Sequence, residues 1–395
     1  MPMSGEPLSR APTSPFALWN LGFRPLYLAA ATFAAIAMGV WTAQVAGWIA
    51  GVHYLSNPHW HAHEMIFGYA LAVIAGFLLT AVRNWTGLPT PAGGRLAAIV
   101  ALWLAGRIFL ATPWPLLSLA ADLAFALAVA IGIGVPLVRS KNTRNLFFIL
   151  LIAILCGANT AFHLAMRGDL ALPVRDMLQL ALNVIAFIMA LMAGRVVPMF
   201  TANGVPGTQP SRRRWLEILA LASLVALALA DLARPAPWIV VAIAASAAMA
   251  HAWRLALWQP LRTLRSPIVW ILHAAYAWLV IYLALRALDA AELIPPGIAV
   301  HALTVGALGG LTLGMMTRTA RGHTGRPLVA GAAEIGCYVL INLAALARVA
   351  LPLALPSLQH ETVVASGLLW VAAFALFVGR YWPLLTRVRA DGRPG

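Results

Sequence analysis

Long apolar runs constrain this chain more than any other feature of its sequence. Twelve of them are each long enough to cross roughly 30 Å of hydrocarbon as a helix. Because unpaired backbone groups are costly in lipid, only helices or closed barrels span a bilayer, and no alternating ten-residue pattern indicates a barrel. The sequence therefore predicts an all-α polytopic protein of about twelve transmembrane helices. The runs lie near residues 25–48, 60–82, 95–112, 115–138, 145–167, 173–199, 214–232, 236–255, 267–288, 297–317, 328–350 and 362–385.

Composition supports one membrane domain over residues 1–395. The chain is 62% hydrophobic and only 10% charged, with a mean hydropathy of +0.85. No segment between the runs is long enough for a soluble domain. Cys156 and Cys337 lie inside apolar runs, which is typical of small buried hydrophobes rather than a structural disulfide. The only extensive partner that this composition requires is the lipid bilayer.

The basic residues indicate topology. A net charge of +15 could suggest nucleic-acid binding, but the 27 Lys and Arg residues lie mostly in short loops between apolar runs. The two tails and every second loop hold 20 of the 27. The positive-inside rule then places these loops and both termini in the cytoplasm of a bacterial inner-membrane, multi-pass protein, and it argues against nucleic acid as a partner. The loop clusters are Arg139, Lys141 and Arg144; Arg212, Arg213 and Arg214; Arg254, Arg262 and Arg265; and Arg318, Arg321 and Arg326.

An internal repeat relates the second and tenth apolar runs. Residues 63–89 align without gaps to residues 301–327, and a weaker copy of the motif ending follows near residue 200. The pattern indicates three blocks of four helices, although any helix that enters the cytoplasm through Gly, Arg and Pro would give part of it. The matched positions are His63/His301, Gly68/Gly306, Gly76/Gly314, Arg83/Arg321, Thr86/Thr324, Gly87/Gly325 and Pro89/Pro327. The blocks would cover about 25–138, 145–255 and 267–385.

A dense histidine motif opens the second apolar run, His59-Trp60-His61-Ala62-His63-Glu64-Met65. At 100° per residue His59 and His63 share one helix face, while His61 and Met65 share another. A regular helix therefore cannot aim all three imidazoles at one metal ion, and two sites, or one site with supporting partners, fit better. Glu64 could accept the free N–H of a ligating imidazole. The alternative is a boundary segment whose histidines simply lie among the lipid headgroups.

Depth links three histidines on separate helices. At 1.5 Å per residue, His63, His163 and His301 each come out about 12 Å above the membrane midplane, on the periplasmic side. Imidazole is a good ligand for haem iron and for copper, and a polar ring at that depth needs a partner. His63 and His301, which are equivalent in the repeat, are the predicted axial haem ligands. A buried histidine that bonds a neighbouring hydroxyl is the alternative for each of them.

Other residues in the apolar runs are candidates for cofactor contact. Gly306 and Gly310 belong to a smooth glycine face, which suits either a flat cofactor or close helix packing. Arg107 and Arg195 could hold haem propionates or a buried carboxylate, or could reach toward the headgroups from helix ends.

His273 is the remaining metal-ligand candidate. It lies toward the cytoplasmic half of its run, away from the outer layer of histidines. Tyr276, three residues further on, could be its partner.

Several motifs together resemble the NnrS family, and the resemblance extends over nearly the whole chain. The resemblance implies a twelve-helix protein that contains haem and copper, is produced alongside denitrification enzymes and protects bacteria against nitric oxide and nitrosative stress. His59 lies outside the family pattern. The motifs are Asn20-Leu21-Gly22-Phe23-Arg24-Pro25; Trp60-His61-Ala62-His63-Glu64-Met65; Gly76-Phe77-Leu78-Leu79-Thr80-Ala81-Val82; Gly194-Arg195-Val196-Val197-Pro198-Met199-Phe200-Thr201; Leu272-His273 with Tyr276; and His301 followed by Gly314-Met315-Met316-Thr317-Arg318 and Gly322-His323-Thr324-Gly325-Arg326.

Three functions compete on these observations. The leading one is a haem and copper protein that binds or handles nitric oxide at a periplasmic-side metal site. The second is a haem-copper oxidoreductase such as a nitric oxide reductase, because three blocks of four helices resemble oxidase subunit I; yet the runs near 173–199 and 214–232, which supply ligands in that superfamily, hold no histidine. The third is a secondary transporter. Transporters usually repeat in halves of six helices, whereas the repeat here indicates blocks of four, and the intramembrane carboxylates expected of a proton relay are scarce apart from Glu64 and Glu334. The sequence makes no prediction for catalysis, the electron donor or the oligomeric state.

Overall fold

The computed structural model describes residues 16–51, 55 and 57–393, and it confirms the all-α polytopic prediction. Proline at the first helical position starts α5, α9 and α10, where its missing N–H costs nothing. Short 3₁₀ turns, η2, η3 and η5, join some of the helices. The main elements are α1 (Phe23–Val45), α2 (Asn57–His63), η1 (Glu64–Ala70), α3 (Leu71–Thr86), α4 (Gly94–Leu110), α5 (Pro115–Arg139), α6 (Phe147–Met166), α7 (Val174–Gly204), α8 (Arg214–Ala233), α9 (Pro237–Leu257), α10 (Pro267–Ala290), α11 (Ile298–His301), η4 (Ala302–Leu308), α12 (Gly309–His323), α13 (Ala332–Ala354) and α14 (Gln359–Thr386).

Eleven helical units in the described residues are long and apolar enough to cross a membrane, and α4 is the remaining one. With 17 residues, α4 is about 25 Å long, just short of the hydrocarbon thickness. The two ends of the described chain lie together, since Phe16 and Arg387 form an antiparallel bridge and the Ala17 N–H donates to the Thr386 carbonyl at 2.7 Å. Both ends therefore lie on one side, which requires an even number of crossings and makes α4 the twelfth. Met1 and Gly395, whose cytoplasmic placement the sequence predicts, lie outside the described residues.

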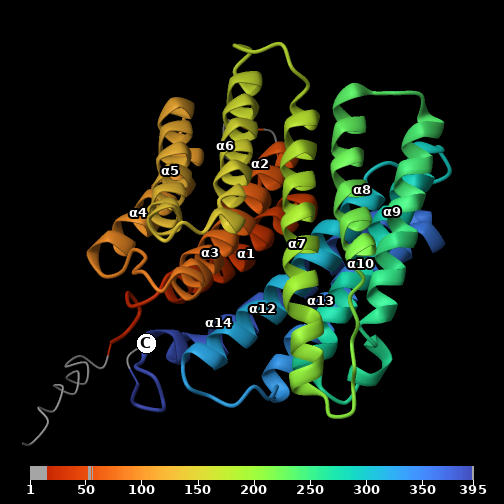
Figure 1. The fold of residues 1–395 in the computed structure, drawn as a ribbon. Helices are drawn as coiled ribbons and strands as arrows, with labels where there is room; N and C mark the ends of the chain where they lie inside the picture. The colour runs from red at the N-terminus through yellow and green to blue at the C-terminus, as the bar shows by residue number, and fades with distance from the viewer. Residues whose placement is uncertain (1–15, 52–54, 56, 394–395) are drawn as a thin grey trace, which may run out of the picture.

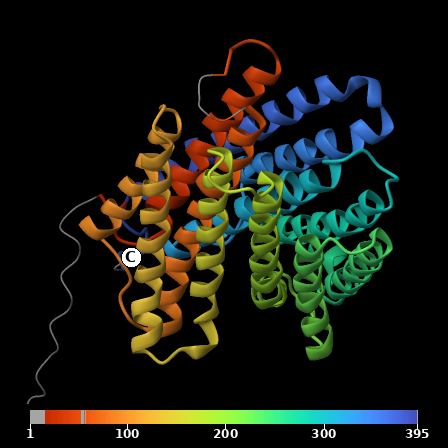
Figure 2. The ribbon, with the colours of Figure 1, turned by 90° about the horizontal axis from the view of Figure 1, so that it is seen from above.

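The helices form three groups in space (Figures 1 and 2). The first group, α4 to α6, stands at one edge, and the green helices α8 and α9 stand at the other. Between them, α1 packs against α3 and α14, and α14 packs against α13. The buried core runs through this middle group, so the second and tenth apolar runs lie at the centre of the molecule.

The two aligned segments of the sequence break their helices in the same way. His63 and His301 are each followed at once by seven residues of π-helix, η1 and η4, at the same offset of 238 positions as the sequence alignment. Each segment then continues as a long α-helix and ends in a left-handed glycine, Gly87 with φ +68° and Gly325 with φ +73°. A π-helix inserts an extra residue and is frequent at functional sites. The structure therefore singles out the stretches that begin at these two histidines.

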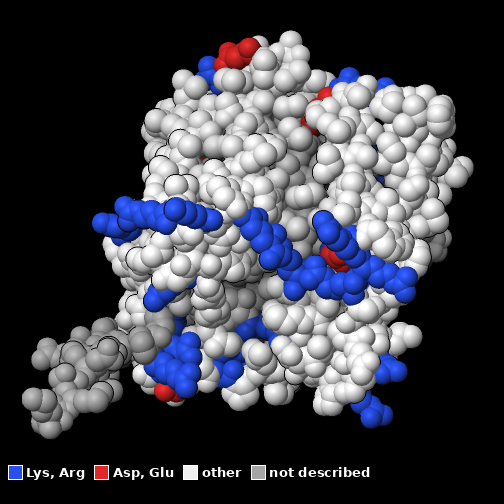
Figure 3. Space-filling view, viewed as in Figure 1, with Lys and Arg blue, Asp and Glu red and all other residues white. Residues whose placement is uncertain are grey.

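Basic side chains form a band across the middle of the face shown in Figure 3. Further Lys and Arg residues lie below this band, and only a few charged residues are visible near the top. The basic residues of the loops after α5 and α7 are exposed, as the positive-inside assignment expects. Two residues of that assignment are exceptions: Arg254 and Arg318 are buried, because each has a partner inside the bundle. Arg254 pairs with Glu217, and Arg318 lies over the ring of Phe200.

Candidate metal centre

Two imidazoles and a carboxylate come together in the first group of helices. His63 ends α2, Asp122 lies on α5 and His163 lies on α6. One possible ligand atom from each residue lies within 4.8 Å of the others, and all three residues are buried. The Oδ2 atom of Asp122 is 3.4 Å from Nε2 of His63 and 3.7 Å from Nε2 of His163. This is the only group of three such residues with metal-binding spacing in the part of the chain that the structure describes.

Neighbouring polar side chains fix the orientation of this group. Nδ1 of His63 donates to Oε1 of Glu64 at 3.0 Å, which is the supporting role that the sequence suggested for this carboxylate. Arg107, on α4, donates to the same oxygen at 2.7 Å and forms a second ion pair with Asp122. Asn159 bridges His63 Nε2 and Asp122 Oδ2 at 2.9 and 3.2 Å. Four segments of the chain thus meet at one polar cluster.

Two glycines make room for the guanidinium. A Cβ on Gly68, in η1, would lie 2.6 Å from an Arg107 nitrogen and 3.1 Å from Oε2 of Glu64. A Cβ on Gly106 would collide with the Asp122 carboxylate. Because a side chain at either position would force the ion pairs apart, the close approach of the helices depends on glycine there.

The charges of this cluster favour a bound cation. Glu64 and Asp122 contribute two negative charges and Arg107 contributes one positive charge, with exposed fractions of 1%, 5% and 8%. One negative charge is left over when both imidazoles are neutral. An unbalanced buried charge is very costly, so the cluster needs either a proton on an imidazole or a metal ion. The arrangement can therefore exchange a proton for a metal cation.

A second site lies on the other side of the same helix. A cavity of about 380 Å³ is lined mainly by apolar side chains, together with His61, His301 and Arg348. Ala62 and Met65 also line it, whereas His63, the next residue after Ala62, belongs to the metal cluster. One helical turn therefore serves two sites, as the angular spacing of the histidine motif indicated.

The two histidines of this cavity are held in different ways. Nδ1 of His301 donates to the carbonyl of Gly297 at 2.6 Å, which leaves Nε2 as the basic nitrogen. The His61 ring stacks on Trp41, with centroids 4.6 Å apart, and its buried Nδ1 has no hydrogen-bond partner among the described residues. A neutral imidazole with a fixed tautomer beside an apolar cavity is a suitable axial ligand for haem.

The structure brings together only two of the three histidines that depth had grouped. The rings of His63 and His163 have centroids 5.0 Å apart, whereas His301 lines the cavity with His61. The expected pairing of His63 with His301 is therefore not what the structure has. His63 contacts residues of α5 and α6, whereas His301 lines a cavity with His61 and Arg348, so equivalence in the sequence repeat did not predict which residues become partners.

The glycine face of η4 and α12 is covered by α10. A Cβ on Gly306 would collide with Trp278, and a Cβ on Gly310 would lie 2.8 Å from the Cβ of Ala275. Close helix packing, one of the two possibilities that the sequence left open, therefore describes these two glycines.

Arg195 and His273 lie away from both sites. Arg195 donates to Oδ1 of Asn145 at 2.8 Å, toward the C-terminal end of α7. Nε2 of His273 shares a hydrogen bond of 2.8 Å with Thr201, so the expected pairing with Tyr276 is wrong. The Tyr276 hydroxyl has other partners, which belong to a separate network.

That network is a third buried polar group, among α7 to α10. Arg254 pairs with Glu217 at 2.5 Å and donates to the Tyr276 hydroxyl at 2.8 Å and to the Ala190 carbonyl at 2.9 Å. The same hydroxyl shares a bond of 2.6 Å with Nδ1 of His251. Every strong donor and acceptor here has a protein partner, so we assign the network to packing.

Sequence reasoning missed two residues of the metal cluster. Asp122 could have been recognised from the sequence, because a carboxylate inside the apolar run 115–138 needs a partner. Asn159 carried no such signal, since a lone amide in a membrane helix is compatible with many roles. Arg107 was expected to hold a propionate or a buried carboxylate, and it contacts two carboxylates.

Comparison with known proteins gives one match. A family model described as NnrS protein matches residues 17–389, nearly the whole chain. No curated protein matches the chain.

Proposed function

This chain belongs to the NnrS family, and on that premise we propose that it is a haem- and copper-containing protein of the bacterial inner membrane that binds nitric oxide as part of a protective response during denitrification. The observation that carries the proposal is the buried group of His63, Asp122 and His163, which leaves a negative charge for a cation. Both termini and the basic loops face the cytoplasm, and the histidines lie in the periplasmic half of the bilayer.

We assign copper to the three-residue group. Two imidazoles and a carboxylate form a donor set that Cu(II) accepts, and the same set also suits Fe(II) and Zn(II). His63 would bind through Nε2, because its Nδ1 is directed to Glu64. Arg107 would hold both carboxylates in place and limit their negative charge.

We assign haem to the cavity that His61 and His301 line. The donors fit this group: both residues are imidazoles, the remaining wall is mainly apolar, and Arg348 offers a guanidinium to a propionate. Reduced haem iron and copper both bind nitric oxide, and that is the chemistry they would supply here. The protein's own contribution is to fix the His301 tautomer through Gly297 and to keep the cavity apolar.

Metal analysis of purified variants tests the copper assignment. We expect His163→Ala and Asp122→Asn to reduce bound copper to background and to remove the Cu(II) electron paramagnetic resonance signal. His273→Gln is the matched control, because His273 is also a buried histidine but bonds Thr201 in the cytoplasmic half. Full copper in the first two variants would disprove the assignment.

Absorption spectra test the haem assignment and the family-based function together. We expect a Soret band in the wild type that shifts on addition of nitric oxide, is lost in His61→Ala and His301→Ala, and is retained in His63→Ala. If His63→Ala and His301→Ala both lose haem and His61→Ala keeps it, the axial haem ligands would be His63 and His301, as the sequence repeat predicts. Absence of any Soret band from purified wild-type protein would refute the proposal.

A further inference from the structure

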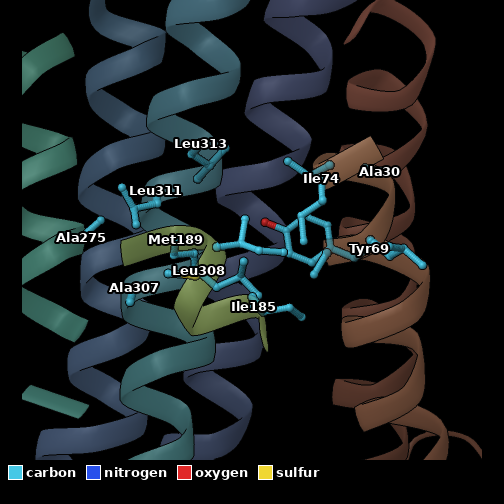
Figure 4. Close-up of a cluster of buried hydrophobic side chains, with 14 of the residues drawn as sticks. Ala30, Tyr69, Ile74, Ile185, Met189, Ala275, Ala307, Leu308, Leu311 and Leu313 are labelled. Carbon is cyan, nitrogen blue, oxygen red and sulfur yellow. The ribbon is translucent and has the colours of Figure 1, made fainter. Parts of the chain in front are cut away.

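A smaller cavity lies where α3, α7 and α12 meet. Its volume is about 90 Å³, and its wall includes Ile74, Met189, Met192, Leu311, Thr312 and Met315. Figure 4 labels three residues of this wall, Ile74, Met189 and Leu311, in one cluster of buried hydrophobic side chains. Thr312 and Tyr27 are the polar residues of the wall, and the Thr312 hydroxyl is already bonded to the carbonyl of Leu308 at 2.7 Å and to Tyr69. An apolar cavity of this kind remains dry and binds small apolar guests.

The rim of this cavity lies at the level of the hydrocarbon core. Phe77, Met192 and Met315 line it and are only partly buried. Each lies within about 8 Å of the middle of its membrane span, counting 1.5 Å per residue. The surface that these side chains keep exposed at this depth meets lipid tails. A molecule dissolved in the bilayer core would therefore meet the rim of the cavity at its own depth.

The inner end of the cavity adjoins the cavity of His61 and His301. Tyr69 lines the histidine cavity and Thr312 lines the smaller one, and their hydroxyls share a hydrogen bond. Leu308, at the end of η4, lines the histidine cavity. Leu311, about one helical turn further on in α12, lines the smaller cavity. The ring of Tyr69 and its bond to Thr312 thus lie between the two spaces.

We propose that the smaller cavity is an entry site through which a small, uncharged, apolar gas passes from the membrane core, past Tyr69, to the cavity of His61 and His301. The gas is nitric oxide if the proposed function holds, and this inference rests on that function for the identity of the gas alone. Such a molecule is more soluble in hydrocarbon than in water, so the bilayer concentrates it at the rim. A cavity of this volume admits a diatomic molecule and leaves no room for a lipid headgroup or a hydrated ion.

Xenon is a direct probe of the site, because it is apolar and needs neither haem nor metal. In crystals under xenon pressure we expect density beside Met189, Leu311 and Thr312. Met192→Trp should fill the cavity and abolish that density. Met199→Trp is the matched control on the same helix, since Met199 is 49% exposed and does not line the cavity, and it should leave xenon binding unchanged. Absence of xenon from the wild type, or a lipid tail in its place, would overturn the proposal.

Rates of nitric oxide binding test the route in protein reconstituted into nanodiscs. We expect Met192→Trp to slow the spectral change severalfold, and Tyr69→Phe to accelerate it, because the ring remains while its bond to Thr312 is lost. Met199→Trp should bind at the wild-type rate. If the purified protein binds xenon but contains no haem, the apolar site stands and the proposed function is refuted. If haem is present but binds nitric oxide at the same rate in all variants, the entry route is refuted.

Discussion

Arg107 is the residue on which the metal cluster depends most. Among the described residues it is the only arginine or lysine paired with both Glu64 and Asp122, and all three are buried. We expect Arg107→Gln to leave Glu64 and Asp122 without their guanidinium partner and to lower the free energy of unfolding by about 3–5 kcal/mol. Denaturation in detergent measures this change. Arg139→Gln, at the exposed C-terminal residue of α5, should change it by less than about 0.5 kcal/mol. Equal stability of the two variants would contradict the charge balance described above.

Gly68 offers a change at the same cluster that alters no charge. Its substitution by Ala places a methyl group 2.6 Å from an Arg107 nitrogen, so the guanidinium must move away from Glu64. We expect Gly68→Ala to lose most of its bound metal in elemental analysis. Gly39→Ala provides the comparison, because a Cβ at Gly39 meets only Val371 at an ordinary 3.8 Å. Metal retention by Gly68→Ala would mean that Arg107 does not shape the site.

For individual residues, the sequence predicted which side chains belong to the sites better than it predicted which of them contact one another. The histidine spacing indicated two sites, and the structure assigns His61 and His63 to different ones. The supporting role of Glu64 also followed from position alone, since the residue adjoins His63. The partners Asp122 and Asn159 come from α5 and α6, and which helices become neighbours depends on packing that hydropathy does not encode.

At the scale of elements, the two π-helices set the direction of the histidines. An extra residue in η1 rotates the preceding turn by about 100° relative to α3, so His63 can face α5 and α6 while α3 faces the core. We expect deletion of Ile66 to restore a regular helix and to withdraw His61 and His63 from their sites. The deletion variant should keep its helical circular dichroism but lose bound metal and the Soret band. Deletion of Val305 in η4 should remove the Soret band and leave the metal of the first cluster in place.

The apolar runs predicted the helices well because length and composition alone decide whether a segment can cross a bilayer. The run 60–82 corresponds to α2, η1 and α3, and the run 297–317 corresponds to α11, η4 and α12. Hydropathy has no signal for a π-helix, because the added residue is itself apolar. The repeat marked the right two places through His63 and His301, yet it gave no reason to expect a break in the helix there.

At the scale of the whole molecule, the pairing of the two chain ends requires an even number of crossings, and the charge pattern decides which side the ends occupy. We expect a cysteine at position 213 to react with a membrane-impermeant maleimide only after the cells are opened. A cysteine at position 169 should react in intact cells. Cys156 and Cys337, which are partly and fully buried, are replaced by Ala beforehand. The reverse labelling pattern would invert the topology and place the histidine sites near the cytoplasm.

The ion pair between Arg107 and Asp122 has a consequence for how the protein is made. These residues lie 15 positions apart on α4 and α5, two adjacent helices joined by a short turn at Pro113. Alone, α4 would offer the translocon a short segment whose guanidinium has only the upstream Glu64 as a carboxylate partner, a poor candidate for release into lipid. If α4 and α5 fold as a hairpin, Arg107 and Asp122 neutralise each other before the helices leave the translocon. We infer that biogenesis inserts them as one unit, and that a ribosome stalled before Asp122 emerges holds α4 outside the bilayer.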